Sequence, residues 1–424
     1  MIYDYLIVGA GISGLNTGVE TLKRNPKARV IILERNPKRT GGRVYTEKFK
    51  VGKTEHTFDA GAGRFSNTHK RVLSLISNYS LDSKVMKIPK GSVFKKTREY
   101  SKSLKFEDAD SIIRELLKAA DAMTKTEREK LKGMTFKEFA AELFKEETAE
   151  FLERGYPYYS EISVINALTA IKAFKNDLNS NKKFYFLSSG LSQITDCLTR
   201  DYRKRGGKLI LGYSVKDISK HPETGVFSVI PDNQDISVKR ARKVVLTMPK
   251  NVLQRLDYLS PLKEQFCSLE CAPLYRIYAV YPKDPETGLV WCHDIKRTIT
   301  DSRIKYIIPI NPAAGSIMIS YTDGPNADYW LNVPDDKLVS RLHKEVMKLY
   351  PEKRDIPEPL TVKKYYWNTG ACYYRKGSNP TELQRKMINP LPGIYICGDS
   401  FSNHQAWMEG ALETSENVVK AIFD

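Results

Sequence analysis

The chain of 424 residues is too long for one ordinary core and suits two domains, which its 41% hydrophobic residues can fill. The net charge of +18 favours anionic partners, but no nucleic-acid motif accompanies it, and we prefer a solvated lysine-rich surface. No apolar run of about 18 residues and no signal-peptide pattern is present, which predicts no membrane span and a cytoplasmic location. The six cysteines are irregularly spaced, so neither a disulfide framework nor a metal site is expected.

The first predicted elements are a strand, a tight turn and a helix. Residues 5–8 form a short apolar run, and Gly9, Gly11 and Gly14 follow it as G-x-G-x-x-G. In this pattern the first glycine permits the turn, the second admits a pyrophosphate, and the third lets the helix pack on the strand. A second apolar strand ends at Glu34, 20 residues after Gly14, where an acid accepts hydrogen bonds from a ribose diol. Together these elements predict a dinucleotide site without a 2′-phosphate.

A second glycine pair decides between cofactors. Gly41, Gly42 and Arg43 follow the acid and the adjacent Arg35. An arginine here can neutralise a pyrophosphate or hold a flavin ring, which a simple NAD site does not require. At this point the sequence resembles the flavin-containing amine oxidase family, in which such a glycine pair follows the ribose acid. The resemblance implies FAD as the cofactor.

Further segments resemble the same family in the same order along the chain. They are residues 58–65, 184–198, 209–219, 241–256 and 393–422. The resemblance implies contacts with the isoalloxazine from the first segment, with adenine from the third, and with the ribityl chain and the pyrimidine edge from the last. The residues that it adds to the cofactor site are Gly61, Ala62, Gly63, Arg64, Val215, Gly398, Asp399 and Met408.

The resemblance also implies an α/β fold, with a Rossmann-like FAD-binding domain of the glutathione reductase type and an inserted α+β substrate domain. The FAD-binding domain is expected to comprise residues 1–75, 183–262 and 362–424, and the substrate domain residues 76–182 and 263–361. The first insert is rich in amphipathic helical runs, and Thr135 and Glu138 make a capping box. The second insert contains strand-like apolar runs and then a predicted helix over residues 335–350.

The activity implied by the resemblance is oxidation of a primary amine or an L-amino acid to the imine, by hydride transfer to flavin N5. Oxygen would then be reduced to hydrogen peroxide. Tyr373 and Trp407 would form two aromatic walls around the substrate. Arg276 stands where the family usually has a lysine that holds a water near N5. Arginine can hold a water, but its pKa above about 12 prevents it from acting as a neutral base.

Two residues indicate different substrates. Cys372, in "TGACYY", resembles the monoamine oxidase branch, in which a cysteine is joined through sulfur to the flavin; a buried thiol beside the cofactor is the alternative. Arg64, in "GAGRF", resembles the amino acid oxidase and tryptophan monooxygenase branch, in which an arginine pairs with the substrate carboxylate. His69 also falls at a matching position. A salt bridge or a pyrophosphate contact is the alternative for Arg64.

Two other functions share the glycine signatures. One is a desaturase or porphyrinogen-oxidase-like enzyme, which needs a wide apolar pocket or a membrane-binding surface. The other is a basic, non-catalytic binding protein that keeps FAD as a structural group. The net positive charge favours an anionic or zwitterionic amine substrate over a polyamine.

Overall fold

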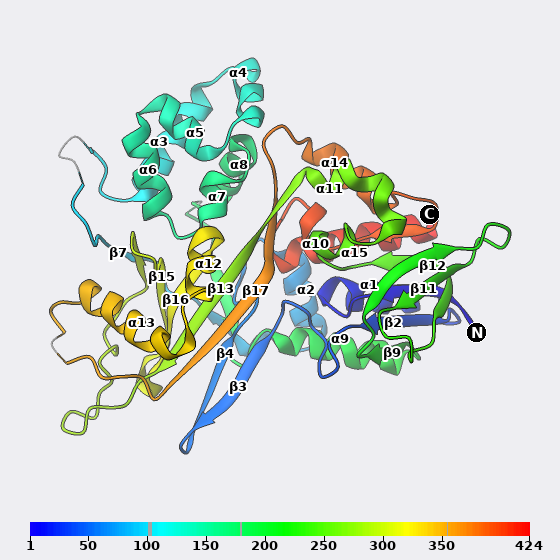
Figure 1. Ribbon diagram of the computed structural model, residues 1–424, viewed down its shortest axis with the longest axis horizontal. Helices are drawn as coiled ribbons and strands as arrows, with labels where there is room; N and C mark the ends of the chain where they lie inside the picture. Colours follow the sequence, from blue (N-terminus) through cyan, green and yellow to red (C-terminus); the bar gives the residue numbers. More distant parts are fainter. Residues whose placement is uncertain (101–103, 179, 354) are drawn as a thin grey trace.

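The computed structural model describes residues 1–424 except 101–103, 179 and 354. It contains two large β-sheets and a group of helices. Figure 1 shows one sheet beside the two termini, the second sheet at the opposite side, and the helical group above the second sheet.

The seven-stranded sheet has the N-terminal strand in its interior. Its order is β10 (Val215–Lys220), β11 (Phe227–Pro231), β12 (Lys239–Leu246), β1 (Ile2–Val8), β2 (Val30–Glu34) and β9 (Lys208–Leu211), and β18 (Ile394–Ile396) also pairs with β12. The pairs made by β1, β2, β9 and β18 are parallel, and those made by β10 and β11 are antiparallel. With α1 (Ile12–Arg24) between β1 and β2, the predicted strand, helix and parallel strand are confirmed.

Both faces of this sheet are covered by buried apolar side chains. The central strand β1 contributes to both cores, because its alternate side chains point to opposite faces. Ile7 packs with apolar residues of α1, α9 (Ser192–Lys204) and α15 (Met408–Phe423). Leu6 and Val8 pack in the second core, with residues such as Phe227 and Leu262. This burial of the central strand fixes the turn that follows it, where the first glycines lie.

The six-stranded sheet is joined to the first sheet by two long strands. Its order is β17 (Thr361–Tyr374), β13 (Leu269–Val280), β16 (Ser316–Asp323), β15 (Tyr306–Asn311), β14 (Thr298–Thr300) and β7 (Val93–Lys95). β13 and β17 are antiparallel neighbours in this sheet, and they extend from it towards the elements beside the seven-stranded sheet (Figure 1). Leu269 and Tyr374, at their paired ends, pack in a core of the seven-stranded sheet. The two strands therefore carry the residues near 372 to the junction.

The helices of the first insert form their own core. The remaining α-helices are α2 (Lys70–Asn78), α3 (Ala109–Ala122), α4 (Lys125–Lys130), α5 (Phe136–Leu143), α6 (Glu146–Gly155), α7 (Tyr159–Ser163), α8 (Ala167–Asp177), α10 (Lys250–Leu253), α11 (Lys263–Cys267), α12 (Gly324–Leu331), α13 (Asp335–Leu349) and α14 (Pro380–Ile388). The predicted capping box is confirmed, since the Glu138 N–H donates to Thr135 Oγ1 at 3.1 Å and the Thr135 N–H donates to Glu138 Oε2 at 2.7 Å. The predicted helix over 335–350 is confirmed as α13.

Two small sheets complete the fold. They are the hairpin of β3 (Thr46–Val51) and β4 (Thr54–Asp59), and the sheet of β5 (Phe65–Ser66), β8 (Phe184–Leu187) and β6 (Val85–Lys87). In the second of these, Ser66 pairs with Phe184, which brings the chain after Arg64 beside β8. In the part of the chain that the structure describes, we find no helix with the length and apolarity that crossing a membrane requires. The domain limits at residues 75, 182, 262 and 361 stay a prediction.

Candidate active site

The first glycine turn lies at the end of β1 and has the backbone that its sequence requires. Gly9 has a φ of +105°, which L-residues with a side chain rarely adopt. A Cβ on Gly14 would lie 2.1 Å from the carbonyl oxygen of Gly9, so the close packing of α1 on the turn depends on glycine there. A Cβ on Gly11 would meet no protein atom within 4 Å. The backbone at Gly11 thus borders space that a ligand can enter.

The second glycine turn lies against the first. The Gly41 N–H donates to the Ala10 carbonyl at 2.8 Å, and a Cβ on Gly42 would lie 3.2 Å from Cα of Gly11. Gly41 and Gly42 have φ values of +93° and +58°. Two turns from separate parts of the sequence therefore present glycine backbone to the same place, as a site for a dinucleotide pyrophosphate needs.

The predicted ribose acid, Glu34, lies at the end of β2 beside this double turn. Its Oε2 accepts from the Ala10 N–H at 2.7 Å, and its Oε1 accepts from the Asn36 N–H at 2.8 Å. The Tyr213 N–H donates to the Glu34 carbonyl at 2.8 Å, which brings the chain before Val215 to the same edge of the sheet. Arg35 is different, because its side chain is exposed.

Arg43, which follows the second glycine turn, meets Asp399 of the segment 393–422. Its guanidinium forms an ion pair with Asp399, and Nη1 also donates to the Gly370 carbonyl at 3.0 Å. Asp399 is 5% exposed. A Cβ on Gly398, the preceding residue, would meet no atom within 4 Å, which is the same open surroundings as at Gly11. The predicted cofactor residues of the N-terminal and C-terminal segments therefore lie together.

The segment from Asp59 to Gly63 packs under Arg43 and is held by Arg276. A Cβ on Gly61 would lie 1.9 Å from the Arg43 carbonyl oxygen, and the Ala62 N–H donates to that carbonyl at 2.9 Å. Arg276 Nη1 donates to the carbonyls of Asp59, at 2.9 Å, and Gly61. A Cβ on Gly63 would lie 3.4 Å from the same Nη1. Arg276 is thus placed beside the glycine segment, and its predicted role of holding a water near the flavin stays a prediction.

Arg64 lies against an aromatic pair. Its guanidinium carbon is 4.5 Å from the ring centroid of Phe184 and 5.5 Å from that of Trp407. These two rings are stacked, with centroids 6.0 Å apart and planes 14° apart. Among the described residues, Arg64 has no hydrogen-bond acceptor and no carboxylate within ion-pair distance, although its side chain is only partly exposed. A surface salt bridge is therefore not what holds Arg64.

His69 and Lys182 border the same aromatic pair. The His69 ring packs edge-on against Trp407 with centroids 4.9 Å apart, and its Nδ1 accepts from the Ser66 N–H at 3.3 Å. Burial and the positive charges of Lys182, His404 and Arg64 lower the pKa of His69 to about 3, so this imidazole is neutral at ordinary pH. Lys182 is 6% exposed and forms an ion pair with Asp177. Within the residues that the structure describes, Arg64 is thus the cation of this group that lacks an anionic partner.

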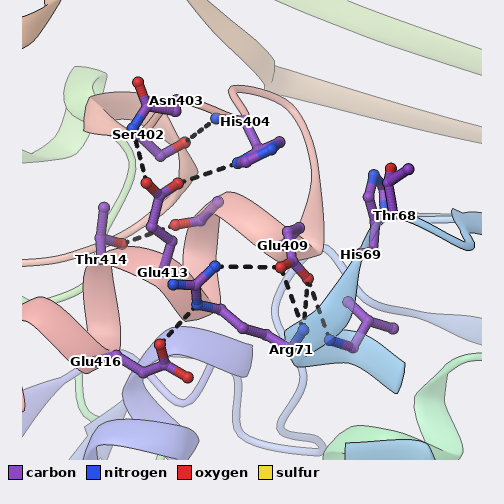
Figure 2. Close-up of polar contacts among 12 residues, drawn as sticks. Thr68, His69, Arg71, Ser402, Asn403, His404, Glu409, Glu413, Thr414 and Glu416 are labelled. Atoms are coloured by element: carbon purple, nitrogen blue, oxygen red, sulfur yellow. Dashed lines mark hydrogen bonds and ion pairs between the residues drawn. The ribbon is translucent and has the colours of Figure 1, made fainter. Parts of the chain in front are cut away.

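Trp407 is held by the start of α15. The buried Glu409 carboxylate is 2% exposed. It accepts from the backbone N–H groups of Arg71 and Val72 and from the Arg71 guanidinium, at 3.1 to 3.2 Å. These bonds fix α15 to the start of α2. Figure 2 shows Arg71 between Glu409 and Glu416, with His69 on the adjoining chain. Met408 is the first residue of α15 and is buried.

Tyr373, the other predicted wall, lies at the end of β17. It is 8% exposed and packs in the core of the helical insert, whereas its neighbour Tyr374 packs in the core of the seven-stranded sheet. The Tyr374 N–H donates to Gln405 Oε1 at 3.1 Å, which ties β17 to the loop before Trp407. The ring that stacks on Trp407 is Phe184, which no pattern in the sequence marks as its partner.

A row of tyrosines continues from Arg276 to the helical insert. The Arg276 guanidinium carbon lies 4.3 Å from the ring centroid of Tyr321, and the Tyr158 ring meets Tyr321 edge-on with centroids 5.4 Å apart. The charges of Arg64 and of Glu161 both act on the Tyr158 hydroxyl. The sequence does not indicate that Tyr158 and Tyr321 meet beside Arg276, because strand and helix periodicity alone does not show which partly buried polar residues pack together.

Cys372 corrects a prediction. It forms a disulfide with Cys271, its cross-strand partner between β17 and β13. The sulfur that a flavin thioether requires is therefore already bonded, and the structure contradicts attachment of flavin through Cys372. It also shows a disulfide where the irregular cysteine spacing indicated no framework. The spacing of 101 residues hides the pair, because only the register of the two strands brings the cysteines together.

Comparison with known proteins identifies the family. The family described as flavin containing amine oxidoreductase matches residues 12–423. The chain belongs to this flavin-containing amine oxidoreductase family. The family match implies a flavin cofactor. The open surroundings of Gly11, in the first glycine turn, and of Gly398, beside the ion pair of Arg43 and Asp399, fit such a group.

Relatives of this amine oxidoreductase cover nearly its whole length. The flavin-dependent L-tryptophan oxidase RebO of Lentzea aerocolonigenes is 22% identical over 476 aligned positions, which include 98% of this chain and 97% of the relative. The structure of wild-type putrescine oxidase bound to putrescine has a TM-score of 0.76 at 16% identity and covers 100% of this chain and 99% of its own. A triple mutant of putrescine oxidase has a TM-score of 0.74 at 16% identity, with coverage of 99% and 98%. These structures show the fold of the amine oxidoreductase.

Proposed function

We propose that this amine oxidoreductase is an FAD-dependent oxidase of α-amino acids, and that the L enantiomer is its substrate. Arg64 carries the proposal, because it is a partly buried cation that lies on an aromatic pair and has no anionic partner in the described part of the chain. A guanidinium in such surroundings binds a carboxylate strongly, since the planar fork can make two parallel hydrogen bonds. The similarity to an L-tryptophan oxidase supports this substrate class.

The cofactor is proposed to be FAD held without a covalent bond. The glycines of both turns would approach its pyrophosphate, Glu34 its adenosine ribose, and Val215 its adenine. Arg43 and the chain at Gly398 and Asp399 would hold the middle of the molecule. No side chain caps the first turn of α15, so its N–H groups are left for the pyrimidine edge of the flavin. The other proposed contacts are Arg35, Gly61, Ala62, Gly63 and Met408.

The residues of this chain would contribute mainly positioning. Arg64 would bind the substrate carboxylate, and Trp407, Phe184 and Tyr373 would exclude water from the bound amine. Arg276 would keep the Asp59–Gly63 segment in place and orient a water with its remaining N–H groups. Bound FAD would supply the two-electron acceptor, with O2 as the final electron acceptor that becomes hydrogen peroxide. The overall balance is amino acid, water and O2 giving 2-oxo acid, ammonia and hydrogen peroxide.

A substrate pair that differs only in the carboxylate tests this function. Purified holoprotein is offered L-amino acids and the amines that correspond to them without the carboxylate, with anaerobic flavin bleaching and peroxide formation as readouts. We expect Arg64→Ala to lower kcat/KM for amino acids by about 100-fold or more, the effect of losing a charge-assisted bidentate contact, and to change that for amines by less than about 5-fold. Arg114→Ala, on the exposed side of α3, is the control.

Each alternative has its own result in this experiment. Equal losses for amines and amino acids would assign Arg64 a structural role and leave a simple amine as the substrate. Flavin that no amine or amino acid reduces would favour the desaturase-like enzyme or the non-catalytic FAD protein. Salt-dependent nucleic-acid binding in the same preparation would favour the second of these.

A further inference from the structure

The parallel strands of the seven-stranded sheet end at the proposed cofactor site and begin at the opposite edge. The glycine turn follows β1, and Glu34 is the last residue of β2, so both lie at carboxyl ends of strands. Helices α1 and α9 return the chain to the other edge, where β2 and β9 begin. In open parallel sheets the ligand site lies outside the carboxyl ends of the strands. The amino edge is therefore not used by the proposed cofactor contacts.

Two basic segments enter the amino edge next to each other. Residues 23–29, KRNPKAR, lead from the end of α1 into β2, and residues 203–208, RKRGGK, lead from the end of α9 into β9. β2 and β9 are parallel neighbours, and Ile31 pairs with Lys208. The register of the sheet therefore brings together two groups of lysine and arginine that are far apart in the sequence.

Tyr202 holds both segments in place. Its side chain is buried, and its hydroxyl donates to the carbonyls of Val30, at 3.0 Å, and Lys208, at 3.1 Å. Gly206 has a φ of +86°, and a Cβ on Gly207 would lie 2.3 Å from the Tyr202 ring. The second segment is thus a tight turn packed on a buried ring, which gives its cations a defined place at the surface.

The acids that form ion pairs at this edge leave several cations over. Their ion pairs are those of Asp4 with Arg29 and Arg242, of Glu20 with Lys23, and of Asp201 with Arg205. Five more cations are exposed and form no ion pair within the described chain, namely Lys27, Arg203, Lys204, Lys208 and Arg240. We call these five cations the basic edge. Their charge is left for an anion outside the chain.

Exposed apolar side chains lie beside the basic edge. Ile2, at the start of β1, pairs with Arg240 on β12, and Val238 precedes Arg240 by two residues. The exposed fractions are 36% for Ile2 and 44% for Val238. At an anionic bilayer, cations meet the headgroups while neighbouring apolar side chains enter the interface. A nucleic acid would use the same cations for its phosphates but would leave these two side chains without a partner, so the combination favours a membrane.

We infer that the basic edge, with Ile2 and Val238, docks this protein on a membrane surface rich in anionic lipid. Docking is peripheral, through headgroup contacts and two shallow apolar side chains, and needs no segment that crosses the bilayer. The carboxyl ends of the strands, with the proposed cofactor contacts, face away from the docked edge. The inference does not depend on the proposed oxidase activity.

Sedimentation of the holoprotein with lipid vesicles tests the docking surface. We expect binding to phosphatidylcholine vesicles that contain about 30% phosphatidylserine, and none to pure phosphatidylcholine, at about 0.1 M salt. Neutralising four cations should lower the partition coefficient by about 30-fold or more, since each cation near an anionic surface contributes roughly 5-fold. The four changes are Lys27→Gln, Arg203→Gln, Lys204→Gln and Lys208→Gln.

A control variant carries the same change in net charge on other elements. Its substitutions are at exposed lysines of α4, α8 and α13, namely Lys125→Gln, Lys172→Gln, Lys337→Gln and Lys344→Gln. We expect this variant to keep binding within about 3-fold of the wild type, because charges farther than a Debye length of about 10 Å from the membrane are screened. Thermal melting of both variants confirms that they fold.

A single apolar change separates a membrane from a nucleic acid. Val238→Ser should lower binding to the acidic vesicles by about 3- to 5-fold, the effect of losing part of one inserted apolar side chain. It should leave binding to a DNA duplex, offered as a competing polyanion, unchanged. Leu331→Ser, at a similarly exposed side chain on α12, is the control and should change neither.

The outcomes that overturn the inference are distinct. Equal losses in the two four-residue variants would mean that net charge alone binds the vesicles. Equal binding to vesicles with and without phosphatidylserine would remove recognition of anionic lipid. Tighter binding to the duplex than to the vesicles, with no effect of Val238→Ser on either, would make this edge a nucleic-acid surface. Flavin reduction is not measured in these assays, so failure of the docking surface and failure of the proposed function are separate results.

Discussion

Arg43 and Asp399 lie 356 residues apart in the sequence and form an ion pair. Arg43 follows the second glycine turn, and Asp399 follows Gly398 and begins a single turn of 3-10 helix. The Asp399 side chain is 7% exposed and the Arg43 side chain 30%. The contact thus joins the N-terminal and C-terminal parts of the chain at the proposed cofactor site. The carboxylate is the less exposed partner.

Asp399→Asn should destabilise the protein because it leaves the Arg43 guanidinium without its counter-charge. We expect a loss of about 2 kcal/mol in the free energy of unfolding, less than for a fully buried pair because Arg43 is partly solvated. Urea unfolding measures this loss, and the flavin content of the purified variant should fall as well. Asp335→Asn, at an exposed ion pair with Lys364, is the control and should change stability by less than about 0.5 kcal/mol. A variant as stable as the wild type would show that the pair contributes nothing.

Two glycines of the first turn should fail in different ways. Gly14→Ala places a Cβ 2.1 Å from the Gly9 carbonyl oxygen, so α1 must move and both stability and flavin content should fall. Gly11→Ala meets no protein atom within 4 Å, and its φ of −71° is ordinary for alanine. The Gly11 variant should therefore fold normally and lose flavin. Thermal melting of the flavin-free proteins separates the two effects, and a normally folded Gly11→Ala that retains flavin would remove Gly11 from the cofactor site.

Denaturation of the holoprotein should release the flavin, because the Cys372 sulfur is bonded to Cys271. We expect the yellow colour in the supernatant after acid precipitation, and four titratable thiols of six in unreduced, unfolded protein. The disulfide closes a loop with a sequence separation of 101, so Cys271→Ser should cost about 2–4 kcal/mol under oxidising conditions. Cys267→Ser, at an exposed free cysteine, is the control. A yellow precipitate would show that the flavin is covalently attached to the protein and would contradict this prediction.

Local patterns were sufficient for much of the fold. The strand that ends before Gly9, the capping box at Thr135 and the helix over 335–350 each depend on residues close together in sequence, and each is confirmed. Ordered motifs of the family then placed Arg43 and Asp399 in one site, and the structure brings them together. Local sequence carries such information because capping and amphipathic burial act within a few residues.

The rest of the site depends on contacts between distant segments. Phe184 reaches Trp407 because β8 pairs with β5, and no pattern around either residue specifies that pairing. Cys271 meets Cys372 only through the register of two long strands. Tertiary pairing of this kind is what sequence periodicity leaves open.

Stability should depend on His69 at mildly acid pH. In the unfolded chain this imidazole gains a proton as the pH falls below about 6.5, whereas in the folded protein burial and the charges of Lys182, His404 and Arg64 lower its pKa to about 3. Between these two pKa values protonation favours the unfolded chain. His69 should therefore lower the free energy of unfolding by about 1.4 kcal/mol for each pH unit of acidification in this range. His69→Gln should remove the contribution of His69 to the pH dependence of the free energy of unfolding. The range from roughly pH 6 to pH 4 lies between the two pKa values and shows this contribution. Unfolding in urea at several pH values measures it, with the exposed His221→Gln as the control, and an unchanged slope in His69→Gln would mean that the folded protein binds the proton as readily as the unfolded chain.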